Sequence, residues 1–106
     1  MPLSDKELLA KTQDELLDLL IEECAEVIQA ATKAKRFGPM QSWPGCNGER
    51  CNADAVIRES LQVNDTLRAY CARLGVRYGD VIEWWASGDL SVKWKDYVKV
   101  PEPSDD

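Results

Sequence analysis

Apolar and polar residues alternate with helical spacing through most of this 106-residue chain. The first long pattern covers residues 4 to about 36 and stops at Gly38, because glycine followed by proline ends helices. Ser4 and Glu7 have the spacing of a capping box, and the unusual length of the segment allows a break near Thr12. The predicted buried stripe advances by three and four residues and consists of Leu17, Leu20, Cys24, Val27, Ala31 and Ala34.

A second long helix is predicted after a loop that covers residues 39–52. Asn52 or Asp54 can cap this helix, which runs to about Leu74 and ends at Gly75. Its predicted buried face consists of Val56, Val63, Leu67, Tyr70 and Leu74. The chain therefore has two long amphipathic helices with a loop between them.

Two shorter helices are predicted in the last third of the chain. Asp80 has the position of a cap for the third helix, which ends near Gly88. A fourth, over residues 89–97, has Asp89 or Ser91 as its cap. The sequence thus predicts an all-α domain over residues 1–100, followed by a disordered acidic tail over residues 101–106.

An acidic cluster lies inside the first long helix and consists of Glu22, Glu23 and Glu26. Glu23 falls at the border of the apolar stripe, whereas Glu22 and Glu26 point away from it. Like charges at this spacing disfavour a helix by about a few tenths of a kcal/mol per pair, and a bound cation would remove that repulsion. A solvated acidic face is the commoner outcome of such spacing. The position of Glu23 at the edge of the core favours a cation site, and oxygen ligands suit magnesium or manganese.

The region around this cluster resembles the first motif of the all-α nucleoside triphosphate pyrophosphohydrolases, the MazG-like superfamily. That motif is Glu-Glu-x-x-Glu, and it is met by Glu22, Glu23 and Glu26. The phage and prophage members are most similar, because they share the helix of small residues that ends in Arg-Phe-Gly. The resemblance extends over roughly residues 5 to 100.

The family's second motif, Glu-x-x-Asp, is met only in part. Asp65 matches its acidic end, but Gln62 replaces the expected glutamate. An amide oxygen can coordinate a metal ion, but it adds no charge and cannot act as a base. Glu59 lies one turn before Gln62 and about 60° around the helix, and could supply the missing carboxylate in a rotated helix. Either the site tolerates an amide or the enzyme is weak or degenerate.

The resemblance implies a helical bundle of about four helices that is completed by association into a homodimer or homotetramer. It also implies magnesium-dependent cleavage of a nucleoside triphosphate into a nucleoside monophosphate and pyrophosphate, with manganese as a possible substitute. The expected metal ligands are Glu22, Glu23, Glu26 and Asp65. Of these, Glu23 or Glu26 would accept the proton of the attacking water. The expected substrate-binding residues are Lys33, Arg36, Gln62, Lys93 and Lys95.

Charge and composition limit the partners. The net charge of −6 argues against a nucleic-acid polymer or an anionic membrane surface, but not against a nucleotide that binds with metal ions. No apolar run approaches the roughly 20 residues that span a bilayer, and the start of the chain lacks the pattern of a secretory signal. We therefore expect a cytoplasmic protein. Three tryptophans, Trp84, Trp85 and Trp94, add aromatic surface that favours an oligomer.

The remaining reactive side chains are few. The chain has no histidine, which excludes histidine-based acid–base or triad chemistry. Cys24 and Cys71 are expected in the core, whereas Cys46 and Cys51 share a loop. Their spacing, the lack of a second ligand pair and the lack of histidine argue against zinc at this pair, and a reversible disulfide is only slightly more favoured. Trp43 in the same loop either stacks on a nucleobase or packs against protein.

Two non-enzymatic alternatives remain. The replacement at Gln62 favours a catalytically degenerate helical protein that senses nucleotides or binds other proteins. A plain helical assembly protein with a solvated acidic ridge is the third possibility. The base, the sugar and the number of subunits cannot be read from the sequence.

Overall fold

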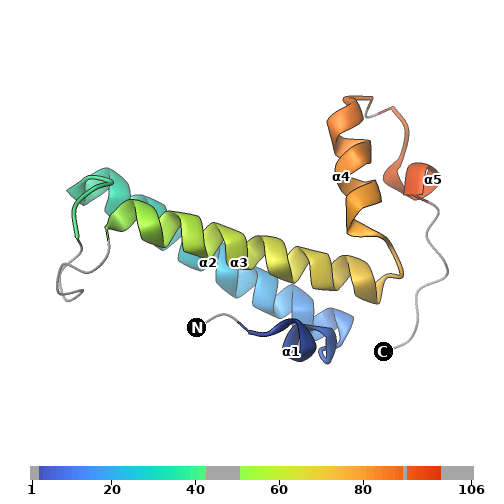
Figure 1. Cartoon of the computed structure of the whole chain (residues 1–106), viewed down its shortest axis with the longest axis horizontal. Coiled ribbons are helices and arrows are strands. Elements are labelled where there is room, and N and C mark those ends of the chain that lie inside the picture. Colours follow the sequence, from blue (N-terminus) through green and yellow to red (C-terminus); the bar gives the residue numbers. More distant parts are fainter. Residues whose placement is uncertain (1–2, 43–50, 90, 99–106) are drawn as a thin grey trace. The chain divides into compact units, whose positions relative to one another are not determined.

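The computed structural model describes residues 3–42, 51–89 and 91–98. Trp43, Cys46 and the predicted tail over residues 101–106 lie outside these ranges. The described part of the chain is all-helical, as predicted, and no strand occurs in it. Its five helices, against the expected four or so, are α1 (Asp5–Leu9), α2 (Gln13–Phe37), α3 (Asn52–Arg73), α4 (Tyr78–Ser87) and α5 (Trp94–Val98) (Figure 1). None of the described helices is long and apolar enough to cross a membrane.

The additional helix arises because the first long segment breaks at Thr12, where a second capping box begins α2. The Glu15 backbone N–H donates to Thr12 Oγ1 at 3.1 Å, and the Thr12 N–H donates to Glu15 Oε1 at 2.9 Å. The predicted capping box of α1 is confirmed, with Ser4 and Glu7 bonded in the same reciprocal way. Each box satisfies backbone donors that a helix start leaves without partners.

The described residues form two compact units, one of Asp18–Thr66 and the other of Met1–Leu17 together with Leu67–Asp106. The apolar core belongs mainly to the second of these units. Its buried hydrophobic residues are Leu8, Leu16, Ala69, Cys71 and Val76. In this unit α3 ends before Gly75, whose φ of 78° is a left-handed conformation that favours glycine.

The shorter helices differ from prediction at their starts. Helix α4 begins at Tyr78 after Arg77, which makes no side-chain capping bond, so the expected cap at Asp80 is wrong. It ends before Gly88, as expected, at a φ of 74°. Helix α5 is shorter than predicted, because Asp89 and Ser91 bond to each other instead of capping a helix. Trp84 Nε1 donates to the Val92 carbonyl at 2.8 Å and so connects α4 to the segment before α5.

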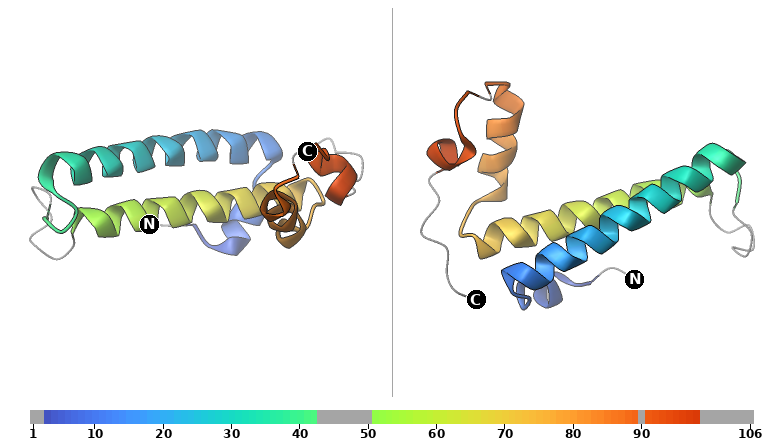
Figure 2. Two further views of the ribbon diagram at one scale, coloured as in Figure 1. Left: turned by 90° about the horizontal axis from the view of Figure 1, so that it is seen from above. Right: turned by 180° about the vertical axis from the view of Figure 1, so that it is seen from behind.

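The unit of Asp18–Thr66 is a pair of antiparallel helical segments from α2 and α3, which run side by side in both views of Figure 2. Asn52 connects the two helices by hydrogen bonds at the end of the pair where α2 ends and α3 begins. Its side-chain Nδ2 donates to the Gly38 carbonyl at 2.9 Å, and its backbone N–H donates to the Gln41 carbonyl at 2.8 Å. The Ala53 N–H bonds the Pro39 carbonyl at 2.7 Å. The Asn52 side chain therefore closes the hairpin, where we had expected a helix cap.

The buried face of α2 differs from the predicted stripe. Cys24, Ala31 and Leu17 are exposed, whereas Glu23 and Ala30 are buried. The other three residues of the predicted stripe, Leu20, Val27 and Ala34, are partly buried. The prediction is therefore wrong in part, because periodicity locates the apolar side of a helix but not the line along which a neighbour covers it.

The five core residues predicted for the second long helix are only partly buried, and Leu74 among them lies just beyond the end of α3. The buried positions on α3 are Asn52, Thr66, Ala69 and Cys71. Within Asp18–Thr66, three of the four buried described residues are therefore polar, namely Glu23, Asn52 and Thr66.

The second capping box yields a stability test. We expect Thr12→Ala to lower the free energy of unfolding by about 1 kcal/mol, because the Glu15 N–H loses its acceptor at the start of α2. Urea unfolding followed by circular dichroism measures the change. Thr32→Ala is the matched control, because the Thr32 hydroxyl only bonds the Ile28 carbonyl of its own helix, at 2.8 Å. Equal losses in the two variants would contradict the capping role.

Candidate functional site

A carboxylate is buried between the two helices of the Asp18–Thr66 unit. Glu23 is only 9% exposed and Thr66 is 1% exposed. The Thr66 hydroxyl on α3 donates a short hydrogen bond to Glu23 Oε1 on α2. A buried carboxylate is uncommon in a protein interior unless it is paired or functional, so this contact marks the candidate site.

The register of the two helices follows from this contact. Positions seven residues apart recur on the same side of a helix, so Glu23 and Ala30 form one line on α2, and Thr66, Glu59 and Asn52 form another on α3. The two helices run in opposite directions. Moving seven residues forward along α2, from Glu23 to Ala30, therefore corresponds to moving seven residues back along α3, from Thr66 to Glu59.

Burial and neighbouring charges act together on Glu23. Burial raises the pKa of Glu23 above its ordinary value, and the hydrogen bond from Thr66 partly offsets this. The negative charges of Glu26, Asp65 and Glu22 raise the pKa further. Three of the predicted ligands, Glu22, Glu26 and Asp65, therefore lie near enough to Glu23 to repel it.

A second carboxyl contact joins the helices at Glu26 and Glu59. The hydrogen bond between these side chains raises the pKa of Glu26, with further contributions from burial and from the charge of Glu59. Two carboxyl groups can share a hydrogen bond only if one is protonated. Glu59 Oε2 is buried and has no hydrogen-bond partner among the described residues. The structure thus brings Glu59 next to the first motif.

The donor set suits a hard cation. Within the described residues no group of three acidic or cysteine side chains already has the geometry to hold a metal ion. The chemistry nevertheless fits magnesium, because the buried Glu23 is repelled by three exposed carboxylates, Glu22, Glu26 and Asp65, and Glu59 offers a buried oxygen without a hydrogen-bond partner among the described residues. Gln62 is partly buried on α3, between Glu59 and Asp65. The assignment of Glu22, Glu23, Glu26 and Asp65 as ligands stays a prediction.

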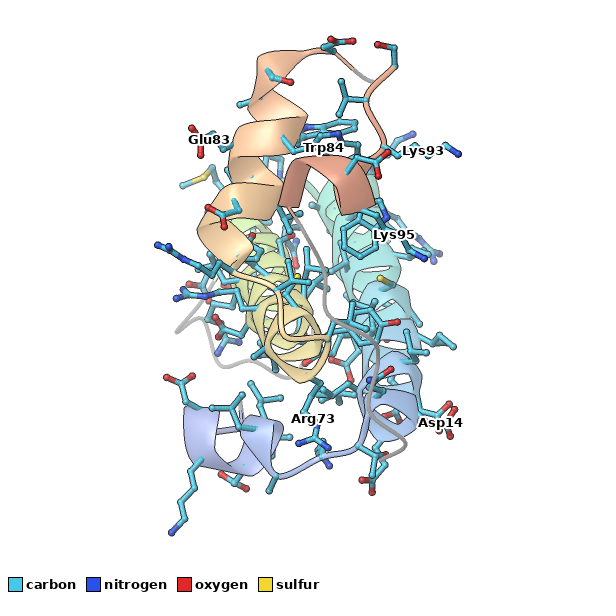
Figure 3. All side chains as sticks on the ribbon, turned by 90° about the vertical axis from the view of Figure 1, so that its right-hand side faces the viewer. Asp14, Arg73, Glu83, Trp84, Lys93 and Lys95 are labelled. Atoms are coloured by element: carbon cyan, nitrogen blue, oxygen red, sulfur yellow. The ribbon has the colours of Figure 1, made fainter. Side chains whose placement is uncertain are left out.

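The predicted basic residues divide between the two units. Lys33 and Arg36 are exposed on α2, in the same unit as the carboxylates, and the Arg36 guanidinium lies 5.3 Å from the centre of the Phe37 ring. Lys93 and Lys95 belong to the other unit and are exposed. Figure 3 shows both lysines on the opposite side of α4 from Glu83. The structure thus brings Lys33 and Arg36, but not Lys93 and Lys95, into the unit of the acidic cluster.

The cysteines follow the prediction only in part. Cys71 is buried, as expected, and burial raises the pKa of its thiol. Cys24 is exposed, so its expected core position is wrong, because it lies on the side of α2 that α3 does not cover. Cys51 is a partly buried free thiol. The expected choice between zinc and a disulfide at Cys46 and Cys51 lies partly outside the described residues.

Sequence reasoning missed Thr66. A threonine beside Asp65 has no distinguishing pattern of its own, and only the register of α2 against α3 places it opposite Glu23. Glu59 was considered only as a substitute in a rotated helix, but the observed helix already places it against Glu26. The spacing of seven residues between Glu59 and Thr66 indicates that both lie on the same side of α3, and this was the feature of the sequence that could have predicted their shared position.

Comparisons with known proteins do not add to this picture. No family model, no curated protein and no solved structure matches the chain.

The shifted carboxyl groups predict an unusual pH dependence for the metal-free protein. Since the pKa values of Glu23 and Glu26 are raised in the folded state, that state binds protons more tightly than the unfolded chain. Stability from these groups is therefore largest below the ordinary glutamate pKa and falls as pH rises through the raised values. We expect the melting temperature to rise as pH is lowered from about 7 to about 4.5 in the presence of a chelator.

Further acidification should reverse this trend. The hydrogen bonds at the capping boxes, chiefly those from the Ser4 and Thr12 backbones, lower the pKa of Glu7 and Glu15, and their contribution is lost as they become protonated. Melting curves across this range test the prediction, with Glu26→Gln expected to flatten the rise. A melting temperature that climbs steadily from acid to neutral pH would contradict it.

Proposed function

We propose that this protein is a magnesium-dependent nucleoside triphosphate pyrophosphohydrolase. It would convert a nucleoside triphosphate into a nucleoside monophosphate and pyrophosphate. The observation that carries the proposal is the buried carboxylate of Glu23, which Glu22, Glu26 and Asp65 surround with further negative charge from two helices. Such a cluster destabilises the metal-free protein, and function is the usual reason for keeping it.

The chain's own residues would have distinct roles. Glu22, Glu23, Glu26 and Asp65 would bind magnesium, and manganese could replace it. The bound ion neutralises phosphate charge and lowers the pKa of a coordinated water. Glu23 or Glu26 would accept the proton of that water. Lys33 and Arg36 would bind the phosphates, since both are exposed cations further along α2. Lys93 and Lys95 are proposed as further phosphate ligands from the resemblance alone.

A catalytically degenerate helical module is the second candidate. Gln62 supports it, because it replaces a charged ligand of the expected motif. The contact between Glu26 and Glu59 supports it further, because the Glu26 side chain already has a hydrogen-bond partner on the facing helix without a metal ion. Pyrophosphate release from nucleoside triphosphates decides between the two candidates.

Glu23→Gln is the central test of the site. It removes the charge with little change in volume, and the amide oxygen can still accept the Thr66 hydroxyl. We expect pyrophosphate release to fall by at least about a hundredfold, while the metal-free protein melts at the same or a higher temperature. Melting curves with and without magnesium, and release assays over common and noncanonical nucleoside triphosphates, provide both measurements.

The control for this test is Glu83→Gln, which makes the same change at an exposed position on α4. It should leave activity unchanged. If Glu23→Gln melts at a lower temperature and magnesium has no effect on the parent protein, Glu23 is structural and the enzyme proposal is wrong.

Gln62→Glu should restore the acid that the motif lacks. A further carboxylate between Glu59 and Asp65 is expected to raise magnesium affinity and pyrophosphate release on the order of tenfold, because ligand charge tunes the affinity for divalent cations. Calorimetric titration with magnesium measures the first effect. Gln41→Glu adds the same charge at an exposed position beyond the end of α2 and is the control. Equal gains from both variants would show a general effect of charge.

We also propose that the chain forms a homodimer or homotetramer. Apolar side chains lie on the outward faces of both helices, with Ile21 and Ile28 on α2 about 69% and 67% exposed, and Ile57 and Leu61 on α3 similarly exposed. Trp85 on α4 is 64% exposed, whereas Trp84 and Trp94 are partly buried. Obligate interfaces cover such surfaces.

Sedimentation tests this association. We expect the parent chain to sediment as a dimer or tetramer at micromolar concentration, and Ile28→Lys to shift it toward the monomer by placing a charge in the apolar strip. Gln29→Lys is the control, because it adds the same charge at an adjacent exposed position. A monomeric parent chain under these conditions would contradict the proposal.

A further inference from the structure

We infer that Thr66 is a positioning residue, whose hydroxyl fixes the Glu23 carboxylate in the orientation that binds a divalent cation. The inference rests on the proposed function and adds to it a residue outside the predicted ligand set. Thr66 would contact neither the cation nor the nucleotide, and would act only through Glu23.

The geometry of the contact supports this role. The Thr66 hydroxyl reaches across from α3 to Glu23 Oε1 on α2, and both side chains are at least nine-tenths buried. A hydroxyl has one hydrogen to donate, whereas a carboxylate has about four acceptor positions. The bond therefore fixes the direction of the carboxylate and leaves acceptor positions for another ligand.

A second threonine in the same unit, Thr32, makes the hydrogen bond to its own helix backbone that Thr66 does not make. The exposed hydroxyl of Thr32 donates to the Ile28 carbonyl four residues earlier, at 2.8 Å, which is a common bond for threonine inside a helix. Thr66 also lies inside a helix, but its hydroxyl is directed to the carboxylate on the neighbouring helix. Its hydrogen-bonding capacity thus serves Glu23 instead of the backbone of α3.

Electrostatic repulsion explains why Glu23 needs such a contact. Glu22, Glu26 and Asp65 all repel it. Without a donor on the facing helix, this repulsion would turn the Glu23 side chain away from the other carboxylates and weaken their joint binding of a cation. A purely structural role, in which Thr66 only satisfies a buried polar group, predicts lower stability but no change in cation affinity.

Calorimetric titration of the full chain with Mn²⁺ alone, without nucleotide, separates these roles. We expect Thr66→Val, which keeps the shape and removes the hydroxyl, to weaken Mn²⁺ binding by about tenfold or more. Thr66→Ser keeps the hydroxyl and should bind within about twofold of the parent. Thr32→Val is the matched control and should bind like the parent. Thr66→Ala replaces the valine variant if circular dichroism shows that the latter does not fold.

A double-mutant cycle completes the test. If Thr66 acts through Glu23, the Thr66→Val change causes no further loss of Mn²⁺ affinity in a Glu23→Ala background, in which both the carboxylate and the acceptor of the Thr66 hydroxyl are absent. Parent-like affinity in Thr66→Val, or an equal loss in both backgrounds, would overturn the inference.

The outcomes also separate this inference from the proposed function. If the parent releases pyrophosphate and Thr66→Val retains parent-like Mn²⁺ affinity, the function stands and the positioning role is wrong. If the parent binds Mn²⁺ but releases no pyrophosphate, the proposed function is wrong, and the affinities alone decide the role of Thr66. A parent chain that binds no Mn²⁺ would overturn both.

Discussion

Burial of the Glu23 carboxylate opposite Thr66 is the constraint on which the rest of the Asp18–Thr66 unit depends. An ionised group removed from water must gain a donor, a proton or a cation. The hydroxyl of Thr66 supplies one donor, and the nearby carboxylates oppose the charge. A second contact between carboxyl groups occurs at Glu26 and Glu59, where the hydrogen bond between the side chains raises the pKa of Glu26. This helix pair therefore brings several acidic groups together, one of them buried.

The two units differ in the residues that they bury. Most of the buried hydrophobic residues belong to the unit that contains α1, α4 and α5, whereas Ala30 is the one that lies in the Asp18–Thr66 unit, among the residues described. The other apolar side chains on the inner sides of α2 and α3 are only partly buried, so each contributes less stability than a fully buried one. Large apolar side chains such as Ile21, Ile28 and Ile57 are exposed on the same two helices.

Local signals predicted the helices well, because capping boxes and glycines act over a few residues. Ser4, Gly38, Gly75 and Gly88 mark the observed helix ends closely. The inward face of α2 could not be predicted in the same way, because periodicity locates the apolar side of a helix but not the neighbour that covers it. The acidic motif identified Glu23, whereas its partner Thr66, 43 residues further along the chain, depends on the register between α2 and α3.

The closure at Asn52 has a consequence for the evolution of the connection between α2 and α3. Three hydrogen bonds join residues 38–41 to Asn52 and Ala53, so the ends of the connection are fixed together by groups outside it. The entropy lost on closing a loop grows only slowly with its length, by about 0.6 kcal/mol for each doubling. Insertions and deletions between these anchors should therefore accumulate more freely during divergence than changes at Gly38 or Asn52. Homologous chains could therefore differ in the length of the connection between α2 and α3 while the register of the two helices stays the same.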